Sequence, residues 1–192
     1  MDGKNRAMGF IDFENINIPA RKKFGAIRLD FNKLAGIMLR DYVRVGCTVY
    51  LPDRMRHLSA EISKQGLEPA LVSPGKSVDG RLILDLLVNA HKDTFDTAVI
   101  ASGDRDYVKA VQVVQQLGKS VKIVTFSSNL GPGLSSVVKK DEILLLDEFV
   151  NEFVPKSFNY VCSVCGKNFT LPFKLQPFQG EPKCYKCLDP KK

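Results

Sequence analysis

Aspartates stand at several points where the chain leaves a predicted strand or enters a predicted helix. Asp12 lies near the end of the apolar run 8–13, and no basic residue is close to it in the sequence. A carboxylate in a buried strand is costly unless a cation or another partner compensates it. Asp79 stands in "GKSVDGR", and Asp104 and Asp106 stand in "ASGDRDY". Oxygen ligands of this kind suit a hard divalent cation such as Mg²⁺ or Mn²⁺.

Four cysteines near the C-terminus have the spacing of a zinc site. Cys162-x₂-Cys165 is followed after eighteen residues by Cys184-x₂-Cys187, and each pair can supply two thiolates to one tetrahedral Zn²⁺. Four thiolates leave no open position, so the predicted ion is structural. Two disulfides are the alternative, but no secretory signal is visible and a fifth cysteine, Cys47, would remain unpaired.

The elements that must position the aspartates follow from the hydrophobic pattern. Strands are predicted at 8–13, 45–51, 69–73, 96–102, 120–126 and 142–146, and helices at 29–42, 54–66, 77–92 and 105–118. Alternating strands and helices imply a mostly parallel sheet that helices cover on both faces. Ligands of such sheets bind beyond the carboxyl ends of the strands. Three separate segments thus deliver carboxylates to one edge of the predicted sheet.

Each acid also has a structural explanation. Asp79 and Asp104 could be acids of a first helical turn, which the helix dipole favours. Asp106 could be a solvated surface residue, and Asp12 could cap a loop. Their joint placement at strand ends favours a site. Asp85 interrupts an apolar run six residues beyond Asp79, so it either supports the site or is a paired structural acid.

Polar and basic residues beside these acids are candidate substrate contacts. Asn15 could hold a water or a substrate phosphate, and Lys76 and Arg81 could contact phosphate; a solvated surface is the alternative for both basic residues. Ser102 and Arg105 complete the predicted substrate-binding set. No P-loop, dinucleotide fingerprint or G-x-S-x-G motif is present.

Length and charge restrict the class of protein further. A chain of 192 residues with 44% hydrophobic residues can hold one ordinary domain and a small appendage. Its net charge of +7 is compatible with a polyanionic partner, although ordinary solubilising charge is the alternative. No signal peptide is visible, and no apolar run approaches the roughly 20 residues of a membrane span. We therefore expect a soluble, cytoplasmic protein without a membrane partner.

Four stretches resemble the NYN domain, a branch of the PIN-like nucleases: "FIDFENIN", "KSVDGRLILDLL", "VIASGDRDYVKAVQVVQQLGKSVKI" and "LSSVVKKDEILLLDEF". The resemblance spans roughly residues 8 to 150, and Tyr107 departs from it because the family more often has Phe there. It implies an α/β, PIN-like three-layer sandwich with a mostly parallel sheet. It also implies a metal-dependent ribonuclease whose site acids match Asp12, Asp79, Asp104 and Asp106, with Asn15 matching the Asn of the first motif.

These patterns predict a nuclease domain at 1–152, a linker at 153–160 and a zinc ribbon at 161–192. The predicted activity is endoribonucleolytic: in-line attack by a metal-activated water leaves a 5′-phosphate and a 3′-hydroxyl. In the ribbon, aromatic residues interleaved with lysines suit single-stranded RNA, or they cover the cysteine turns; they are Phe169, Phe173, Phe178 and Tyr185. A non-catalytic RNA-binding or regulatory module and a metal-dependent small-molecule phosphatase remain alternatives. A homo-oligomer is compatible with the sequence.

Overall fold

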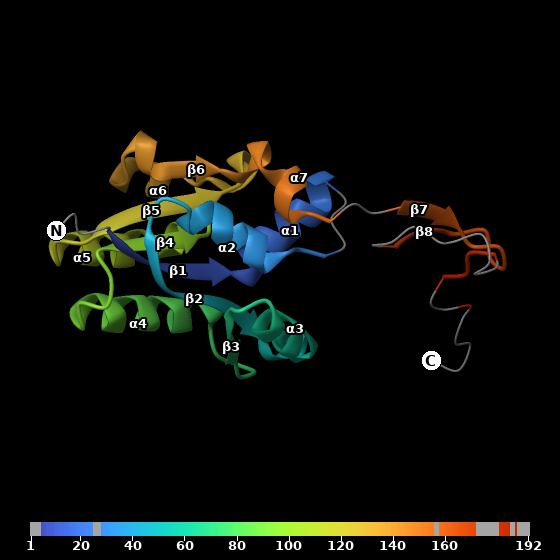
Figure 1. Ribbon diagram of the computed structural model, residues 1–192, viewed down its shortest axis with the longest axis horizontal. Coiled ribbons are helices and arrows are strands. Elements are labelled where there is room, and N and C mark those ends of the chain that lie inside the picture. Colours follow the sequence, from blue (N-terminus) through green and yellow to red (C-terminus); the bar gives the residue numbers. More distant parts are fainter. Residues whose placement is uncertain (1–4, 25–27, 156–157, 172–180, 185–186, 188–192) are drawn as a thin grey trace.

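The computed structural model describes residues 5–24, 28–155, 158–171, 181–184 and 187. Its centre is a six-stranded sheet in the order β3-β2-β1-β4-β5-β6, in which every neighbouring pair is parallel (Figure 1). The strands are β1 (Arg6–Asp12), β2 (Val43–Pro52), β3 (Glu68–Val72), β4 (Thr97–Ala101), β5 (Ser120–Thr125) and β6 (Ile143–Leu145). The predicted parallel sheet is confirmed.

Helices cover both faces of this sheet and form a three-layer α/β sandwich. They are α1 (Phe13–Phe24), α2 (Phe31–Leu39), α3 (Ser59–Lys64), α4 (Val78–His91), α5 (Val108–Gln116), α6 (Pro132–Val137) and α7 (Val150–Phe153). Short 3₁₀ helices are η1 (Asp53–Leu58), η2 (Arg105–Tyr107), η3 (Ser127–Asn129), η4 (Lys140–Glu142) and η5 (Leu146–Glu148). One core contains buried residues of α1, α2, α3 and α7, and the other contains those of α4, α5 and α6. Two separate apolar cores therefore hold the sheet from opposite sides.

The alternation along β1 decides where its last side chain points. Phe10 belongs to the core under α4 and α5, whereas Ile11 belongs to the core on the opposite face. Successive side chains of a strand point to opposite faces. Asp12 therefore follows Phe10 toward the face that α4 and α5 cover.

The main difference from the predicted elements is α1, which starts immediately after Asp12. Its Glu-Asn-Ile-Asn sequence and the internal Pro19 obscure the helical signal, yet Phe13, Ile16 and Ala20 are buried at helical spacing. β1 consequently ends one residue earlier than predicted. The predicted helix 54–66 is divided between η1 and α3, and α6 and α7 lie outside the predicted helices.

The C-terminal segment contains an antiparallel hairpin of β7 (Phe158–Val161) and β8 (Asn168–Leu171). β7 begins inside the stretch predicted as a linker, and α7 ends at Phe153, next to the predicted end of the larger domain. The domain boundaries stay predictions. Throughout the described ranges, every helix is too short or too polar to cross a membrane.

Candidate carboxylate site and cysteine cluster

Asp12 is buried at the carboxyl end of β1 and caps the helix that follows. Its Oδ1 accepts hydrogen bonds from the backbone N–H groups of Glu14 and Asn15, at 3.1 and 3.2 Å. The side-chain amide of Asn15 donates to Oδ2 at 2.9 Å. Neutral donors thus compensate part of the cost of burying this carboxylate. The predicted role of Asn15, to hold a water or a substrate phosphate, stays a prediction.

A tyrosine joins Asp12 to a second acid from another element. The Tyr107 hydroxyl lies 2.9 Å from Oδ2 of Asp12 and 2.6 Å from Oδ1 of Asp79. Asp79 is in the first turn of α4, which Ser77 caps by accepting the Gly80 N–H at 3.1 Å. A phenol carries one proton, so it can donate fully to only one of the two carboxylates. The other acid is left without that donor.

The charge of Asp79 disfavours ionisation of Asp12. Burial raises the pKa of Asp12 and is the largest cause of the shift; the nearby Asp79 charge raises it further, while hydrogen bonds from Asn15 and Tyr107 lower it. Burial and the two carboxylates also raise the pKa of Tyr107, which therefore keeps its proton. Within the described residues, no Lys or Arg forms an ion pair with either acid. A cation between them would favour both ionised forms.

The second predicted pair of acids stands in the turn after β4, the strand next to β1. The Ser102 hydroxyl is buried and accepts the Asp104 N–H at 3.2 Å, and Oδ1 of Asp104 accepts the Asp106 N–H at 3.1 Å. Asp104 therefore caps η2, whereas Arg105 and Asp106 are exposed. These contacts hold the turn at the carboxyl edge of the sheet, and within the described residues Arg105 forms no ion pair.

Glycine is required in this turn for space. A Cβ on Gly103 would lie 2.1 Å from the backbone oxygen of Asn129 and 2.7 Å from Oγ1 of Thr125. The Gly131 N–H also donates to the Gly103 oxygen at 3.2 Å. The loop after β5 therefore packs directly on the turn that carries Asp104.

These residues fit a divalent cation in chemistry but do not form a closed cage. Among the residues that the structure describes, only four cysteines bring three or more candidate ligand atoms within 4.8 Å of one another. Mg²⁺ in proteins is usually bound by one or two carboxylates together with waters and substrate phosphate. Asp12 and Asp79, joined through Tyr107, suit that mode, with Asp104 in the neighbouring turn. The assignment of Asp12, Asp79, Asp104 and Asp106 as ligands stays a prediction.

The two basic residues predicted to contact phosphate line one cavity of about 410 Å³ between β3 and α4, and Asp79 is not part of its lining. Its lining comprises Leu71, Val72, Ser73, Lys76, Ser77, Gly80, Arg81 and Leu84. Nε of Arg81 donates to Oδ2 of Asp85 at 2.8 Å, and Asp85 is also hydrogen bonded to the buried Tyr50. Asp85 is thus a paired acid, which was one of the two alternatives for it.

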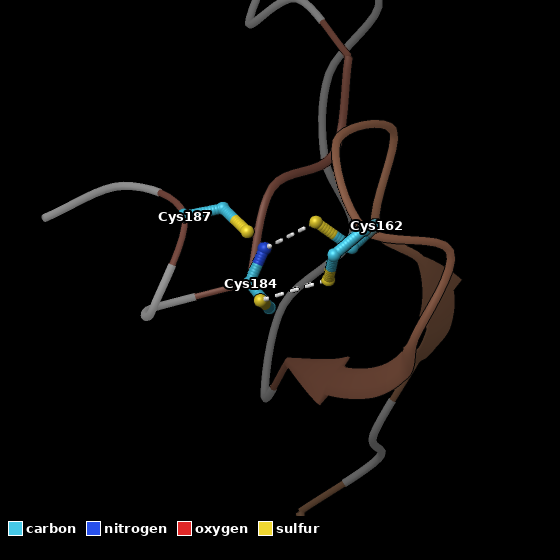
Figure 2. Close-up of side chains that lie close together, drawn as sticks. Cys162, Cys184 and Cys187 are labelled. Atoms are coloured by element: carbon cyan, nitrogen blue, oxygen red, sulfur yellow. Dashed lines mark hydrogen bonds between the residues drawn. The ribbon is translucent and has the colours of Figure 1, made fainter. Parts of the chain in front are cut away.

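The four C-terminal cysteines gather around one point, as Figure 2 shows for the labelled residues. Their sulfur atoms all lie within 4.8 Å of one another, and those of Cys165 and Cys184 are 3.8 Å apart. A tetrahedral site with Zn–S distances near 2.3 Å has sulfur atoms about 3.8 Å apart. All five cysteines are free thiols. The cluster can therefore hold Zn²⁺, as a zinc ribbon would.

Backbone contacts inside the cluster favour a thiolate. The Cys184 N–H donates to Sγ of Cys162 at 3.3 Å, and this bond is the largest cause that lowers the pKa of Cys162 to about 6. The thiolate is the form of cysteine that binds metal. Of the aromatic residues predicted to serve RNA, Phe169 packs against Tyr160 with ring centroids 5.9 Å apart. Phe173, Phe178 and Tyr185 lie outside the described residues.

Tyr107 is the residue of this site whose role the sequence did not reveal. In the sequence it stands out only as a departure from the Phe that is common in the family. Its buried hydroxyl touches two acids that come from β1 and α4. A Tyr at a position predicted to be buried usually needs a hydrogen-bond partner, and this could have indicated a contact with an acid.

Comparison with known proteins places this architecture in a family. Residues 6–142 match the NYN domain, so the chain belongs to the NYN domain family and thereby to the PIN-like nuclease superfamily. No curated protein matches the chain. The structure is similar to the crystal structure of a protein of unknown function from Vibrio parahaemolyticus RIMD 2210633, with a TM-score of 0.65 and 18% identity. That match covers 80% of this chain and 98% of the other and shows a shared fold.

Proposed function

We propose that this protein is a metal-dependent ribonuclease that cleaves RNA internally. The observation that carries the proposal is the convergence of Asp12 and Asp79 on the Tyr107 hydroxyl in an NYN domain. Membership of a nuclease superfamily favours a phosphodiester substrate over the small phosphate esters of the phosphatase alternative. RNA in single-stranded form is the expected substrate, because a strand can then bend into a narrow edge of the sheet.

The residues of this chain have distinct roles in the proposed reaction. Asp12 and Asp79 would hold Mg²⁺ or Mn²⁺, and Asp104 and Asp106 would complete or orient the shell. When bound, such an ion lowers the pKa of a coordinated water and neutralises charge on the scissile phosphate. Asn15 fixes the orientation of Asp12 through its amide.

Substrate binding would use the basic residues on either side of Asp79. Lys76 is exposed and has no ion-pair partner within the described residues, so its charge is available to a phosphate. Arg81 already forms an ion pair with Asp85 through Nε, so its other guanidinium N–H groups would contact the phosphate. Arg105 and the turn that contains Ser102 would contact the scissile phosphate from the other side.

We further propose that the four cysteines bind a structural Zn²⁺ and that the resulting ribbon strengthens RNA binding. A segment of this length cannot bury a large core, so metal binding would supply folding free energy. Its high density of lysine matches a polyanion.

One observation favours a second candidate, an RNA-binding module without cleavage. Asp12 accepts three hydrogen bonds from Glu14 and Asn15, shares the Tyr107 hydroxyl with Asp79, and caps α1. These contacts would preserve an acid at this position for structural reasons alone. The two functions differ in whether RNA is cut when a cation is supplied.

The deciding experiment incubates end-labelled single-stranded RNA with the full chain in Mn²⁺ or in chelator. The proposal expects internal cuts in Mn²⁺ only, with 5′-phosphate and 3′-hydroxyl ends. Retarded migration of RNA in chelator, with no cuts at any Mn²⁺ concentration, would leave the binding module as the function. Cuts that persist in chelator would contradict metal dependence.

A further inference from the structure

A second groove of about 410 Å³ lies between α1 and η3, apart from the cavity that Lys76 and Arg81 line. Its lining comprises Ile18, Pro19, Lys22, Lys23, Ser128 and Asn129. The two hollows have no lining residue in common. This groove, called here the α1 groove, has no part in the site described above.

Both walls of the α1 groove continue from the carboxylate site. The α1 wall lies on the helix that begins directly after Asp12, and Asn15 on the same helix donates to that acid. The opposite wall contains Asn129, whose backbone oxygen lies against Gly103 in the turn before Asp104. The α1 groove is therefore built on the same two segments that follow Asp12 and pack on the Asp104 turn.

An ion pair fixes the spacing of the two walls. Lys23 near the end of α1 is paired with Asp147. Asp147 also accepts hydrogen bonds from Ser127, at 2.7 Å from the backbone N–H and 3.0 Å from the hydroxyl. Because η3 and α1 are tied to the same carboxylate, the groove is held open in a defined shape.

The side chains in the groove offer three kinds of contact. Ile18 is 44% exposed and gives the α1 wall an apolar side chain. Lys22 is exposed and, within the described part of the chain, has no ion-pair partner. The Ser128 hydroxyl and the Asn129 amide add polar groups at the rim.

We propose that the α1 groove binds one nucleotide of the single-stranded RNA that flanks the scissile phosphate. A base would lie against Ile18, the adjoining phosphate would meet Lys22, and Ser128 and Asn129 would hydrogen bond to the sugar or base edge. Charge complementarity and continuity with the carboxylates favour nucleic acid over a protein segment. The inference rests on the proposed function and adds a defined path for the strand.

Lys22→Gln tests the phosphate contact, and Lys92→Gln is its matched control. Both lysines are exposed near the C-terminal end of a helix, but Lys92 follows α4 at the opposite edge of the sheet. Binding of a fluorescent single-stranded RNA to the full chain is measured in chelator over a range of salt concentrations. The binding constant K falls as salt rises, so a plot of log K against log salt has a negative slope. Losing one phosphate contact should make this slope less steep by about 0.7 and weaken binding about fivefold at roughly 0.1 M salt. Lys92→Gln should do neither.

Ile18→Ala tests the apolar contact without a change in charge. Alanine is a better helix former than isoleucine, so α1 is expected to stay folded. The smaller side chain should weaken RNA binding about threefold or more, with an unchanged salt slope. In Mn²⁺ the variant should raise KM and leave kcat unchanged, because the contact is the same in the ground and transition states.

The outcomes separate this inference from the function on which it rests. If the wild-type protein binds RNA but Lys22→Gln and Ile18→Ala bind it as Lys92→Gln does, the α1 groove serves another partner and the inference is wrong, while the proposed ribonuclease stands. If the wild-type protein binds no RNA, both are wrong. Weaker binding by the two groove variants alone supports the assignment.

Discussion

The phenol oxygen of Tyr107 lies 2.9 Å from Oδ2 of Asp12, although 95 residues separate the two in sequence. The same oxygen also contacts Asp79, so a single proton is placed between two carboxylates. This arrangement stabilises one negative charge well and two poorly. A cation bound at this edge would therefore stabilise the ionised forms of both acids.

Tyr107→Phe should move the acid limb of the pH–rate profile to higher pH. The Tyr107 hydrogen bond lowers the pKa of Asp12, and burial raises it. Without the phenol the Asp12 pKa should rise further, because a donor that stabilises the carboxylate is lost. A higher pH is then needed to ionise Asp12. Initial rates of RNA cleavage in Mn²⁺, measured as a function of pH, check this.

Tyr42→Phe is the matched control, because the Tyr42 ring contacts the Lys122 ammonium group rather than Asp12 or Asp79. It should leave the pH–rate profile unchanged. An identical acid limb in wild type and Tyr107→Phe would show that the phenol does not influence the ionisation on which the rate depends.

Gly103→Ala should destabilise the fold, because the new Cβ would meet the Asn129 backbone oxygen at 2.1 Å. Overpacking of this kind typically costs about 1–3 kcal/mol. Gly36→Ala is the control: it is exposed in α2 with nothing within 4 Å of its Cβ position, and it should stabilise by about 0.5–1 kcal/mol. Urea unfolding of both variants measures the difference. Equal stabilities would mean that the loop does not pack on this turn.

The parallel sheet could be predicted because its strands are short apolar runs separated by amphipathic helices. α1 could not be predicted in the same way, since Glu14, Asn15 and Asn17 interrupt its apolar spacing and Pro19 stands inside it. Its start depends on Asp12, whose carboxylate accepts the first free backbone N–H groups. A residue that looked like a metal ligand in the sequence is also a helix cap.

The site was predictable as a set of strand ends but not as a set of contacts. The rule that strand ends meet at one edge predicted that Asp12, Asp79 and Asp104 lie together, and the structure joins Asp12 to Asp79 through Tyr107. It could not reveal that Tyr107 stands between two of them, because that contact depends on how α5 enters the core. The cysteine spacing was more informative than the aspartate positions, because two Cys-x₂-Cys pairs can bind one metal ion in few arrangements.

Cys165→Ser should release the metal from the C-terminal cluster. Three thiolates and a hydroxyl bind Zn²⁺ much less tightly than four thiolates, because serine remains protonated at neutral pH. Elemental analysis should find about one Zn per wild-type chain and almost none in the variant. RNA affinity in chelator-free buffer should also fall. Wild-type protein without zinc, and with oxidised cysteines, would contradict the zinc assignment.

Asp12→Asn should be at least as stable as wild type in chelator near neutral pH. Burial raises the Asp12 pKa in the folded protein above its ordinary value. Stability from this group is therefore full at low pH and is lost as pH rises through the folded pKa. Asparagine removes the buried charge and keeps an oxygen for the N–H groups of Glu14 and Asn15. A variant that melts well below wild type in chelator would indicate a purely structural Asp12.

Added Mn²⁺ should raise the melting temperature of the wild type more than that of Asp12→Asn, because a ligand that binds only the folded state stabilises it. Asp41→Asn is the control, since Asp41 is exposed just before β2 at the opposite edge of the sheet. It should respond to Mn²⁺ as the wild type does. Equal shifts in all three proteins would place the ion elsewhere.

The central claim is that carboxylates at this edge hold the cation that RNA cleavage requires. The most direct measurement is the initial rate of RNA cleavage as a function of Mn²⁺ concentration for wild type, Asp12→Asn and Asp41→Asn. Wild type and Asp41→Asn should give the same saturating curve, with no cleavage in chelator. Asp12→Asn should lose more than the roughly 10- to 100-fold that removing a partner of a metal ligand costs. Cleavage by Asp12→Asn at the wild-type rate and Mn²⁺ dependence would contradict the account.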